Sequence, residues 1–387
     1  MKRGMSGYYV PCSTVGEICN AFVPNPLPPT PPLEITGTLK KIEDEALISL
    51  GRLDAISSLL PDPHLFLYTY VRKEAVLSSQ IEGTQSTLTD LLIFERKGAP
   101  GVPREDVQEV SGYVKATDYA LKAISENYPI SIRLIKGVHR SLLEKGRGSS
   151  KDPGELKRTQ NWVGGTRPGN AVFIPTPPNL VLECLGELEK YMNREQDASP
   201  LIKAALAHVQ FETIHPFLDG NGRIGRLLIT LILCADKALS QPLLYLSLYF
   251  KQHRKEYYDL LQQVRTEGDW EEWLQFFMLG VKETADLAVG TAKRLAAMFR
   301  EDEERIRNSG RMAGSALRVH KAMQRGPVFS ANEARNATGL SLPTANKTIQ
   351  LLVKLGIARE ITRQRRNRLF AYDRYLKILN EGTEPIK

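Results

Sequence analysis

Apolar residues recur at the spacing of an α-helix along most of this chain, from about residue 35 onward. The first repeat places Leu39, Ile42, Ala46, Leu50 and Leu53 on one stripe, as expected for a helix that packs against a core. The same periodicity predicts further helices over residues 64–82, 86–96, 104–126, 131–144, 179–193, 198–214, 222–236, 247–266, 269–286 and about 287–308. The pattern therefore predicts a mainly α-helical protein.

Two stretches depart from this helical pattern. Residues 1–34 end in a proline-rich run, which predicts an extended N-terminal arm. Residues 156–178 carry glycines and prolines around two short β-prone pieces, 161–163 and 171–174, so we expect a small β-hairpin there. An ordinary surface hairpin without a function is the alternative.

The pattern changes again near the C-terminus. We expect helices over residues 316–323, 331–338 and 343–355, followed by β-prone pieces at 357–362 and 369–372 around a basic tip. This order resembles a winged helix, in which a helix–turn–helix precedes a β-hairpin wing. The expected winged-helix domain spans residues 310–387.

Composition places the chain in an ordinary class. Its 387 residues are 42% apolar and 25% charged, as in a globular protein with two or three domains. The longest apolar run, residues 227–235, is too short to span a membrane, and the first residues lack the apolar core of a signal peptide. The four cysteines show no metal-binding spacing. We therefore expect a cytoplasmic, reduced protein without membrane contact.

The positive charge is concentrated in the C-terminal domain. From Arg311 onward there are 15 Lys and Arg against 5 Asp and Glu, whereas the remaining residues carry 37 basic and 39 acidic groups. A net charge of +10 on so small a domain favours a polyanion such as DNA. Dimerisation or the docking of a protein partner is the alternative. The candidate DNA contacts are Lys347, Arg363, Arg365, Arg366 and Arg368.

Residues 215–226 combine a histidine, a glycine-rich turn and two arginines. Gly220 and Gly222 allow main-chain N–H groups to converge on an anion, and the helix that follows adds the free N–H groups of its first turn. Arg223 and Arg226 lie on one face of that turn, where the helix dipole disfavours cations. A bound polyphosphate would remove this conflict.

This segment resembles the signature of the Fic family, His-Pro-Phe-x-Asp/Glu-Gly-Asn-Gly-Arg-x-x-Arg. Every specified position is present: His215, Pro216, Phe217, Asp219, Gly220, Asn221, Gly222, Arg223 and Arg226. The resemblance implies transfer of AMP from ATP to a Ser, Thr or Tyr hydroxyl of a target protein, called AMPylation. It also implies an all-helical catalytic core with a small hairpin, the flap, that pairs with the target.

The resemblance assigns a role to each residue of the loop. His215 is the candidate general base, and Asp219 is the candidate ligand of Mg²⁺, which prefers carboxylate and phosphate oxygens. Asn221 and the loop amides would stabilise charge on the α-phosphate, while the two arginines would hold the β- and γ-phosphates. The expected nucleotide contacts are Asp219, Gly220, Asn221, Gly222, Arg223, Ile224, Gly225, Arg226, Tyr257 and Tyr258, with Gln252 and Arg265 as further candidates.

A second motif lies upstream. Ser78, Glu82 and Gly83 match the family's inhibitory motif, Ser/Thr-x-x-x-Glu-Gly/Asn, at the end of a predicted helix. Glu82 would sit at the negative end of that helix dipole, where a carboxylate needs a cation. The implied cation is Arg226, so that Glu82 would compete with the γ-phosphate. A solvated glutamate at a helix end is the alternative.

The resemblance extends to the domain plan and the partners. We expect an N-terminal arm over 1–34, a helical region with the inhibitory helix over 35–100, the Fic core over 101–309 and the winged helix over 310–387. The family also suggests self-modification and a homodimer. Removal of AMP, transfer of another nucleotide, and a DNA-binding regulator that senses nucleotide are the alternative functions. The expected flap residues are Val163, Gly164, Gly165, Thr166, Val172, Phe173 and Ile174.

Overall fold

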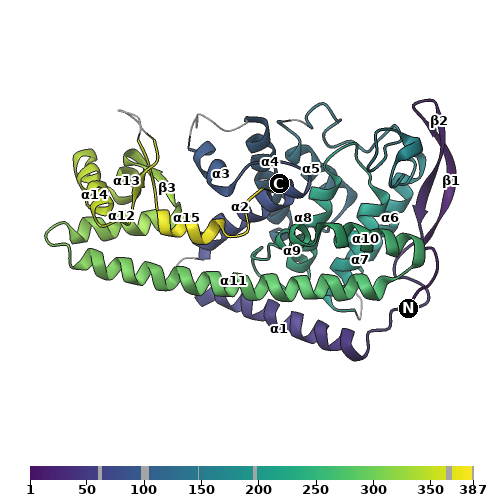
Figure 1. The fold of residues 1–387 in the computed structure, drawn as a ribbon, viewed down its shortest axis with the longest axis horizontal. Coiled ribbons are helices and arrows are strands. Elements are labelled where there is room, and N and C mark those ends of the chain that lie inside the picture. The colour runs from purple at the N-terminus through teal and green to yellow at the C-terminus, as the bar shows by residue number, and fades with distance from the viewer. Residues whose placement is uncertain (60–62, 97–103, 147, 195–197, 363–367, 386–387) are drawn as a thin grey trace.

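The computed structural model describes residues 1–59, 63–96, 104–146, 148–194, 198–362 and 368–385. The fold is mainly helical, with two small antiparallel sheets in this part of the chain, which confirms the predicted fold class. Helix α11 (Trp270–Arg307) runs along the molecule between an N-terminal hairpin and the C-terminal domain (Figure 1). Among the described helices, none is long and apolar enough to cross a lipid bilayer.

Helix α7 lies at the centre of the core and carries the residues that lead into the candidate site. All its residues from Leu201 to Ile214 are buried, which accounts for an apolar sequence on nearly every face. The hydroxyl of Ser199 caps its first turn by accepting a hydrogen bond from the Ile202 N–H. The helices packed against it are α6 (Pro178–Asn193), α8 (Asn221–Ala235), α10 (Arg254–Glu267) and α11.

The N-terminal helices cover the other side of α8. Helix α2 contacts α8 and ends before Gly83, whose φ of +100° lies in the left-handed region that glycine favours. Ser131 caps the first turn of α5 through its hydroxyl, as a helix start at this position requires. The helices of this region are α1 (Gly37–Leu59), α2 (Pro63–Ile81), α3 (Leu88–Phe94), α4 (Arg104–Ser125) and α5 (Ile132–Leu142).

Two predicted helix boundaries are wrong. The helices expected at 269–286 and about 287–308 form the single helix α11, which is straight enough for α1 to pack along it (Figure 1). Conversely, the helix expected at 247–266 is divided at His253, whose ψ of +35° departs from helical geometry. The two parts are α9 (Ser247–Gln252) and α10.

The N-terminal segment is folded back on itself, which corrects the expected extended arm. Strands β1 (Gly7–Thr14) and β2 (Glu17–Pro24) pair in register from Gly7 opposite Pro24 to Thr14 opposite Glu17. The turn places Val15 and Gly16 at positive φ, as a two-residue hairpin turn requires. Valine is rare in this conformation, so little in the sequence indicates the turn.

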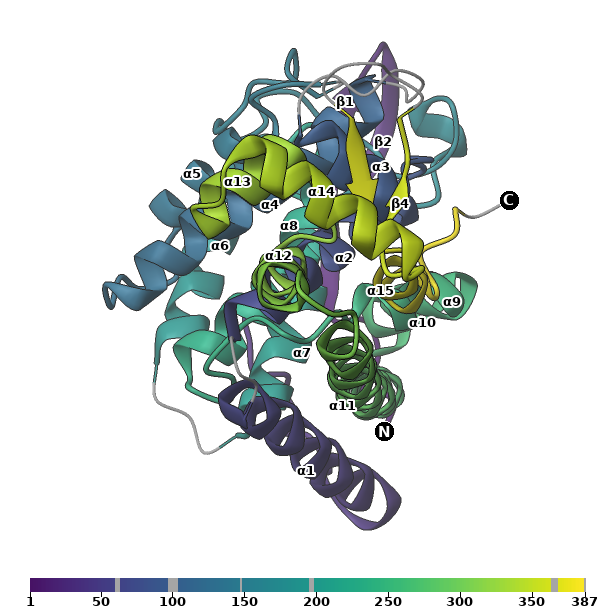
Figure 2. The ribbon, with the colours of Figure 1, turned by 90° about the vertical axis from the view of Figure 1, so that its left-hand side faces the viewer.

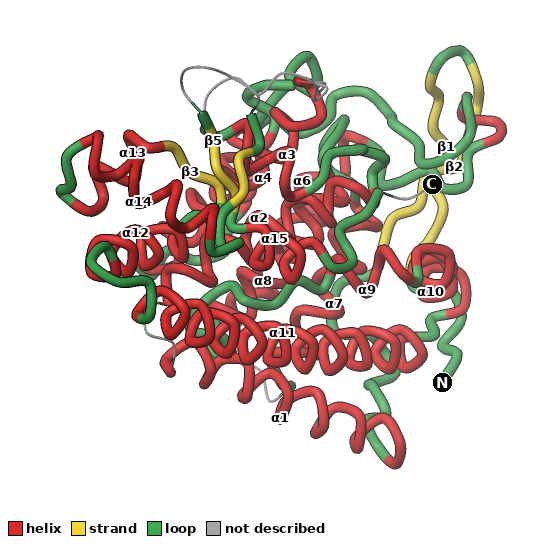
Figure 3. Tube along the Cα trace, turned by 60° about the vertical axis from the view of Figure 1, so that its left-hand side comes forward, coloured by secondary structure: helices red, strands yellow, loops and turns green. Residues whose placement is uncertain are grey.

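The C-terminal domain has the element order of a winged helix (Figures 2 and 3). Helix α14 corresponds to the recognition helix and exposes Lys347, whereas Ile349 faces the core. Strand β3 and helix α15 were not predicted. The elements are α12 (Ala313–Arg325), β3 (Val328–Ser330), α13 (Ala331–Thr338), α14 (Leu342–Lys354), β4 (Arg359–Glu360), β5 (Leu369–Ala371) and α15 (Asp373–Asn380), with strand order β3-β5-β4.

The predicted DNA contacts are only partly described. Arg363, Arg365 and Arg366 lie outside the described residues. Arg368 is at the edge of β5, where it pairs with Glu360 at 3.4 Å and lies over the Phe370 ring. DNA binding by this domain therefore stays a prediction.

Candidate active site

His215 terminates α7 in a left-handed conformation, with φ of +51° and ψ of +61°. Its N–H still donates to the Phe211 carbonyl at 2.9 Å, so the residue is held at the helix end. Pro216 then prevents the helix from continuing. A non-glycine residue seldom adopts this conformation unless its surroundings fix it.

Phe217 anchors the turn that holds the His215 backbone in this conformation. Its side chain is fully buried and stacks on His139, with ring centroids 3.8 Å apart. His139 Nε2 donates to the Asp219 carbonyl at 3.0 Å and its Nδ1 accepts from the Gly154 N–H at 2.7 Å, so the ring is neutral. Burial lowers the pKa of His139 to about 4, in agreement with this role. The turn after His215 is thus packed as firmly as a core element.

Asn221 closes the loop that follows. Its Oδ1 accepts from the Phe217 N–H at 2.9 Å, and its Nδ2 donates to the Phe217 carbonyl at 2.8 Å. Gly220, with φ of +79°, forms the N-cap position of α8, whose first turn leaves main-chain N–H groups without helical acceptors. The side chain of Asn221 thus shapes the loop, and the main-chain N–H groups are the donors left for an anion.

Arg226 points from α8 to the end of α2. Its Nε donates to Ser78 Oγ at 2.9 Å, and its Nη2 donates to the Ser78 carbonyl at 2.9 Å and to Glu82 Oε1 at 2.7 Å. Burial alone would raise the pKa of the Glu82 carboxyl, but the guanidinium beside it lowers that pKa below its ordinary value. The predicted pair of Glu82 and Arg226 is therefore present, and Ser78 of the same motif holds the arginine.

The sequence of this region has known relatives. Residues 129–233 match the profile of the Fic/DOC family, and residues 40–122 match that of the Fic/DOC family N-terminal region. Residues 129–233 therefore form a Fic/DOC family region, preceded by the N-terminal region of the same family.

Two curated relatives are the proteins named protein adenylyltransferase Fic from Drosophila grimshawi and Culex quinquefasciatus. The first is 31% identical over 258 residues, or 64% of this chain and 50% of that protein. The second is 31% identical over 251 residues, or 61% and 47%. The chain thus spans about half the length of these relatives. The crystal structure of a Fic family protein from Desulfovibrio desulfuricans shares the fold, with a TM-score of 0.57 and 21% identity over 89% of this chain and 98% of that one.

Arg223, the other arginine of the Fic loop, is already paired with acids. Its Nη1 lies 2.7 Å from Glu109 Oε1 of α4, and its Nη2 donates to Asp219 Oδ1 at 3.3 Å. Glu109 was not predicted, since one acidic residue on an amphipathic helix gives no sign of a distant partner. A phosphate ligand at Arg223 would have to share it with these carboxylates.

The His215 ring lies between acidic and basic groups, with its Nδ1 3.9 Å from Glu212 Oε2. Burial, with Lys157 and Arg265 nearby, lowers its pKa to about 3, so the imidazole is neutral near pH 7. Lys157 was not predicted; its N–H donates to the Pro216 carbonyl at 2.9 Å and its Nζ to Asn161 Oδ1 at 2.7 Å. A neutral ring is the form that accepts a proton.

The two candidate tyrosines of the nucleotide pocket differ. Tyr257 is buried, and its hydroxyl donates to Nε2 of the neutral His208 at 2.9 Å, so it belongs to the core. Tyr258 is half-buried under Arg254, whose Cζ lies 5.3 Å from the ring centroid. Tyr258 is thus the tyrosine that remains a candidate for the nucleotide. Gln252 is exposed on α9.

The predicted flap is present as a minimal hairpin. Val163 and Phe173 form a single antiparallel bridge, in which the Val163 N–H donates to the Phe173 carbonyl at 2.8 Å. Gly164 to Thr166 are exposed at its turn, and Val172 is 72% exposed. Pairing of a target with this hairpin stays a prediction.

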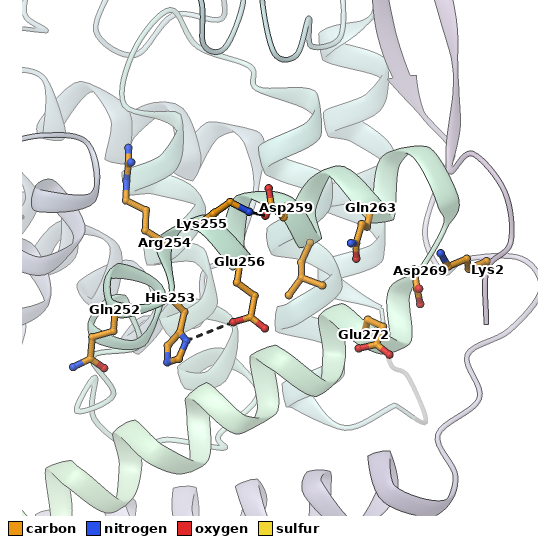
Figure 4. Close-up of a pocket in the computed structure, with 11 residues that line it drawn as sticks. Lys2, Gln252, His253, Arg254, Lys255, Glu256, Asp259, Gln263, Asp269 and Glu272 are labelled. Atoms are coloured by element: carbon orange, nitrogen blue, oxygen red, sulfur yellow. Dashed lines mark hydrogen bonds and ion pairs between the residues drawn. The ribbon is translucent and has the colours of Figure 1, made fainter.

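A polar surface hollow of about 710 Å³ lies elsewhere, over α10 and the start of α11 (Figure 4). It is lined by polar and charged groups such as His253, Glu256 and Asp259, and by no residue of the 215–226 loop. It is therefore separate from the candidate active site.

Proposed function

We propose that this chain is a protein adenylyltransferase that transfers AMP from ATP to a hydroxyl of a target protein, and that Glu82 keeps this activity low. The contact of Arg226 with Glu82, beside the glycine-rich loop, carries the proposal. Glu82 occupies the guanidinium that would hold the γ-phosphate, so the carboxylate and the phosphate compete for it. The names of the relatives from Drosophila grimshawi and Culex quinquefasciatus support the same reaction.

The reaction is a displacement at the α-phosphorus. The acceptor oxygen forms a bond to phosphorus, the bond to the β-phosphate bridge breaks, and pyrophosphate leaves. His215, neutral at physiological pH, takes the proton of the hydroxyl. The N–H groups at the start of α8 are preorganised toward the charge that develops on the phosphate.

Asp219 fits a Mg²⁺ ion that arrives with ATP. Its carboxylate is 38% exposed at the mouth of the loop, while its carbonyl is fixed by His139. Mg²⁺ in nucleotide sites is commonly held by one or two protein carboxylates together with phosphate oxygens, so one Asp suffices. Among the described residues, no group of three or more His, Cys, Asp or Glu side chains is placed to hold a metal ion. The ion would neutralise phosphate charge.

Glu82 restrains the reaction by occupying Arg226. The guanidinium is 2% exposed and has two contacts with Ser78 of α2 and one with Glu82 directly after it, so a γ-phosphate must displace the carboxylate to reach it. The carboxylate also crowds Gly222, where an added Cβ would lie 2.2 Å from Glu82 Oε1. Nucleotide binding and the position of Glu82 are therefore coupled.

The test compares four full-length proteins incubated with ATP labelled at the α-phosphate, alone and with a cell lysate. Glu82→Gly should raise the label on protein at least about tenfold, the effect of a difference of about 1.4 kcal/mol in competition for Arg226. Glu82→Gly with His215→Ala should show none. The matched control is Glu126→Gly, an exposed helix-end glutamate after α4.

Two results would contradict the proposal. If Glu82→Gly is no more active than the wild type, the restraint is wrong. If it removes label from protein that already carries AMP and adds none, the reaction runs toward AMP removal.

A further inference from the structure

Arg265 of α10 is buried against the helix end that carries His215. Its Nε donates to Thr213 Oγ1 at 3.1 Å, and its Nη2 lies 3.5 Å from the Glu212 carbonyl oxygen. Only 8% of the residue is exposed. A buried guanidinium is costly unless its N–H groups are used, so this placement needs an explanation.

Pro216 explains why the Glu212 carbonyl accepts a donor from another helix. In an uninterrupted helix this carbonyl would accept from the N–H of residue 216, but proline has none. Arg265 supplies an N–H at this place and binds the neighbouring Thr213 hydroxyl. It therefore completes the last turn of α7, directly before His215.

The same guanidinium also contacts the flap. Its Cζ lies 3.9 Å from the centroid of the Phe173 ring, which is buried. Cation–π attraction is strongest when both groups are shielded from water. Phe173 is the residue that pairs with Val163 in the bridge of the flap, so one side chain of α10 contacts both the flap and the end of α7.

The other side of the flap is attached to the same region. Asn161 Nδ2 donates to the Phe217 carbonyl at 2.8 Å, and the Lys157 N–H donates to the Pro216 carbonyl at 2.9 Å. The segment before Val163 is thus fixed to the two residues after His215. On the other side of the flap, Arg265 joins Phe173 to Glu212 and Thr213, which directly precede His215.

We propose that Arg265 is a positioning residue that sets the flap in register with His215. An acceptor segment paired with the flap would then present its hydroxyl at the distance that the base requires. This role rests on the proposed AMP transfer and extends it to the recognition of the acceptor. Arg265 acts through Phe173 and the end of α7, without contact to either substrate.

The experiment uses full-length Glu82→Gly protein as the enzyme and a tagged His215→Ala copy of the chain as the acceptor. Arg265→Met should raise the apparent KM for the acceptor about tenfold, while the KM for ATP changes by less than about twofold. Phe173→Leu should have the same effect, and the double variant should be no worse than the more affected single one. Arg265→Lys, which keeps the charge but not the planar group, should recover part of the loss. Arg194→Met is the control, because that arginine lies over Tyr191 on α6, with 5.3 Å from Cζ to the ring centroid.

Hydrogen exchange of the wild-type chain and Arg265→Met gives a second measurement that needs no transfer activity. Exchange in residues 161–174 should accelerate, while peptides of α8 stay unchanged. Unchanged exchange in the flap, or acceleration throughout the chain, would overturn the proposal, as would additive effects of Arg265→Met and Phe173→Leu on KM. If the His215→Ala acceptor takes no label while lysate proteins do, the chain is not its own acceptor; if neither is labelled, the proposed function fails, and the exchange measurement still decides the role of Arg265.

Discussion

Arg226 Nη2 and Glu82 Oε1 are 2.7 Å apart, and the two partners differ in their access to water: the arginine side chain is 2% exposed and the glutamate 33%. The arginine is fixed by two further hydrogen bonds to Ser78, whereas the described contacts hold the carboxylate through Arg226. The carboxylate is therefore the member of the pair that can leave. An incoming phosphate would find the guanidinium already in place.

Ser78→Ala tests how far the serine contributes to this restraint. The change removes the acceptor of the Arg226 Nε but keeps the Ser78 carbonyl and Glu82. One such hydrogen bond to a charged group contributes about 1.5–3 kcal/mol, so the guanidinium should be held less firmly in the position where Glu82 pairs with it. We expect AMP transfer between that of the wild type and that of Glu82→Gly. Activity equal to the wild type in the labelled-ATP assay would show that Glu82 alone determines the restraint.

The C-terminal segment contacts α2, the helix that ends directly before Glu82. Lys73 of α2 is 2% exposed, and its Nζ donates to the Glu381 carbonyl at 2.8 Å. Gln80 Nε2 donates to the Thr383 carbonyl at 2.8 Å. A chain that stops at Asn380 would leave the Lys73 ammonium buried without this acceptor, at a cost of about 1–3 kcal/mol.

Urea unfolding checks this prediction. The truncated chain should unfold at a lower urea concentration than the full chain. Lys73→Met should restore much of the stability of the truncated chain, because it removes the buried ammonium, but it should not stabilise the full chain. Lys377→Met, an exposed lysine on α15, is the matched control. Equal urea midpoints for the full and truncated chains would show that the residues after Asn380 do not contribute to stability.

Sequence periodicity predicted the helical core because α7 and α8 are apolar on most faces and burial follows from that directly. The residue types at 215–226 located the loop of the candidate site, because a histidine, glycines and arginines lie within twelve consecutive positions. The hairpin β1–β2 escaped prediction because its turn uses Val15 at positive φ. The link of Arg223 to Glu109 and that of Arg265 to Phe173 join distant segments, and no local pattern records such pairs.

Buried histidines, among them His139 and His208, should make stability depend on pH. Burial lowers the pKa of His139 to about 4 and that of His208 to about 3, whereas an unfolded histidine titrates near 6.5. The unfolded chain therefore binds more protons below pH 6.5, and the contribution to stability is full above that pH and falls as the pH decreases. Each histidine should reduce the free energy of unfolding by about 2 kcal/mol between pH 7.5 and pH 5.

His208→Gln isolates this effect, because raised carboxyl pKa values such as that of Glu74 act in the opposite direction. His208 Nδ1 donates to the Gly225 carbonyl at 2.8 Å, and a glutamine amide can replace that donor without titrating. The difference in the free energy of unfolding between wild type and variant should shrink by about 2 kcal/mol from pH 7.5 to pH 5. If this difference stays constant between pH 7.5 and pH 5, protonation of His208 does not affect the free energy of unfolding in this range.

The C-terminal domain offers a test of DNA binding on a described residue. Lys347 is exposed on α14, in the position of a recognition helix, and the adjoining Thr348 is buried, so the lysine can be changed without loss of packing. If the domain binds DNA, Lys347→Glu should weaken binding and reduce the salt dependence by about one phosphate contact, a change of about 0.9 in the slope of log K against log salt. Lys354→Glu, in the last turn of the same helix, is the comparison. Electrophoretic shifts at several salt concentrations measure both quantities. Identical slopes for wild type and Lys347→Glu would place α14 away from the DNA, and no shift at low salt would favour docking of a protein partner.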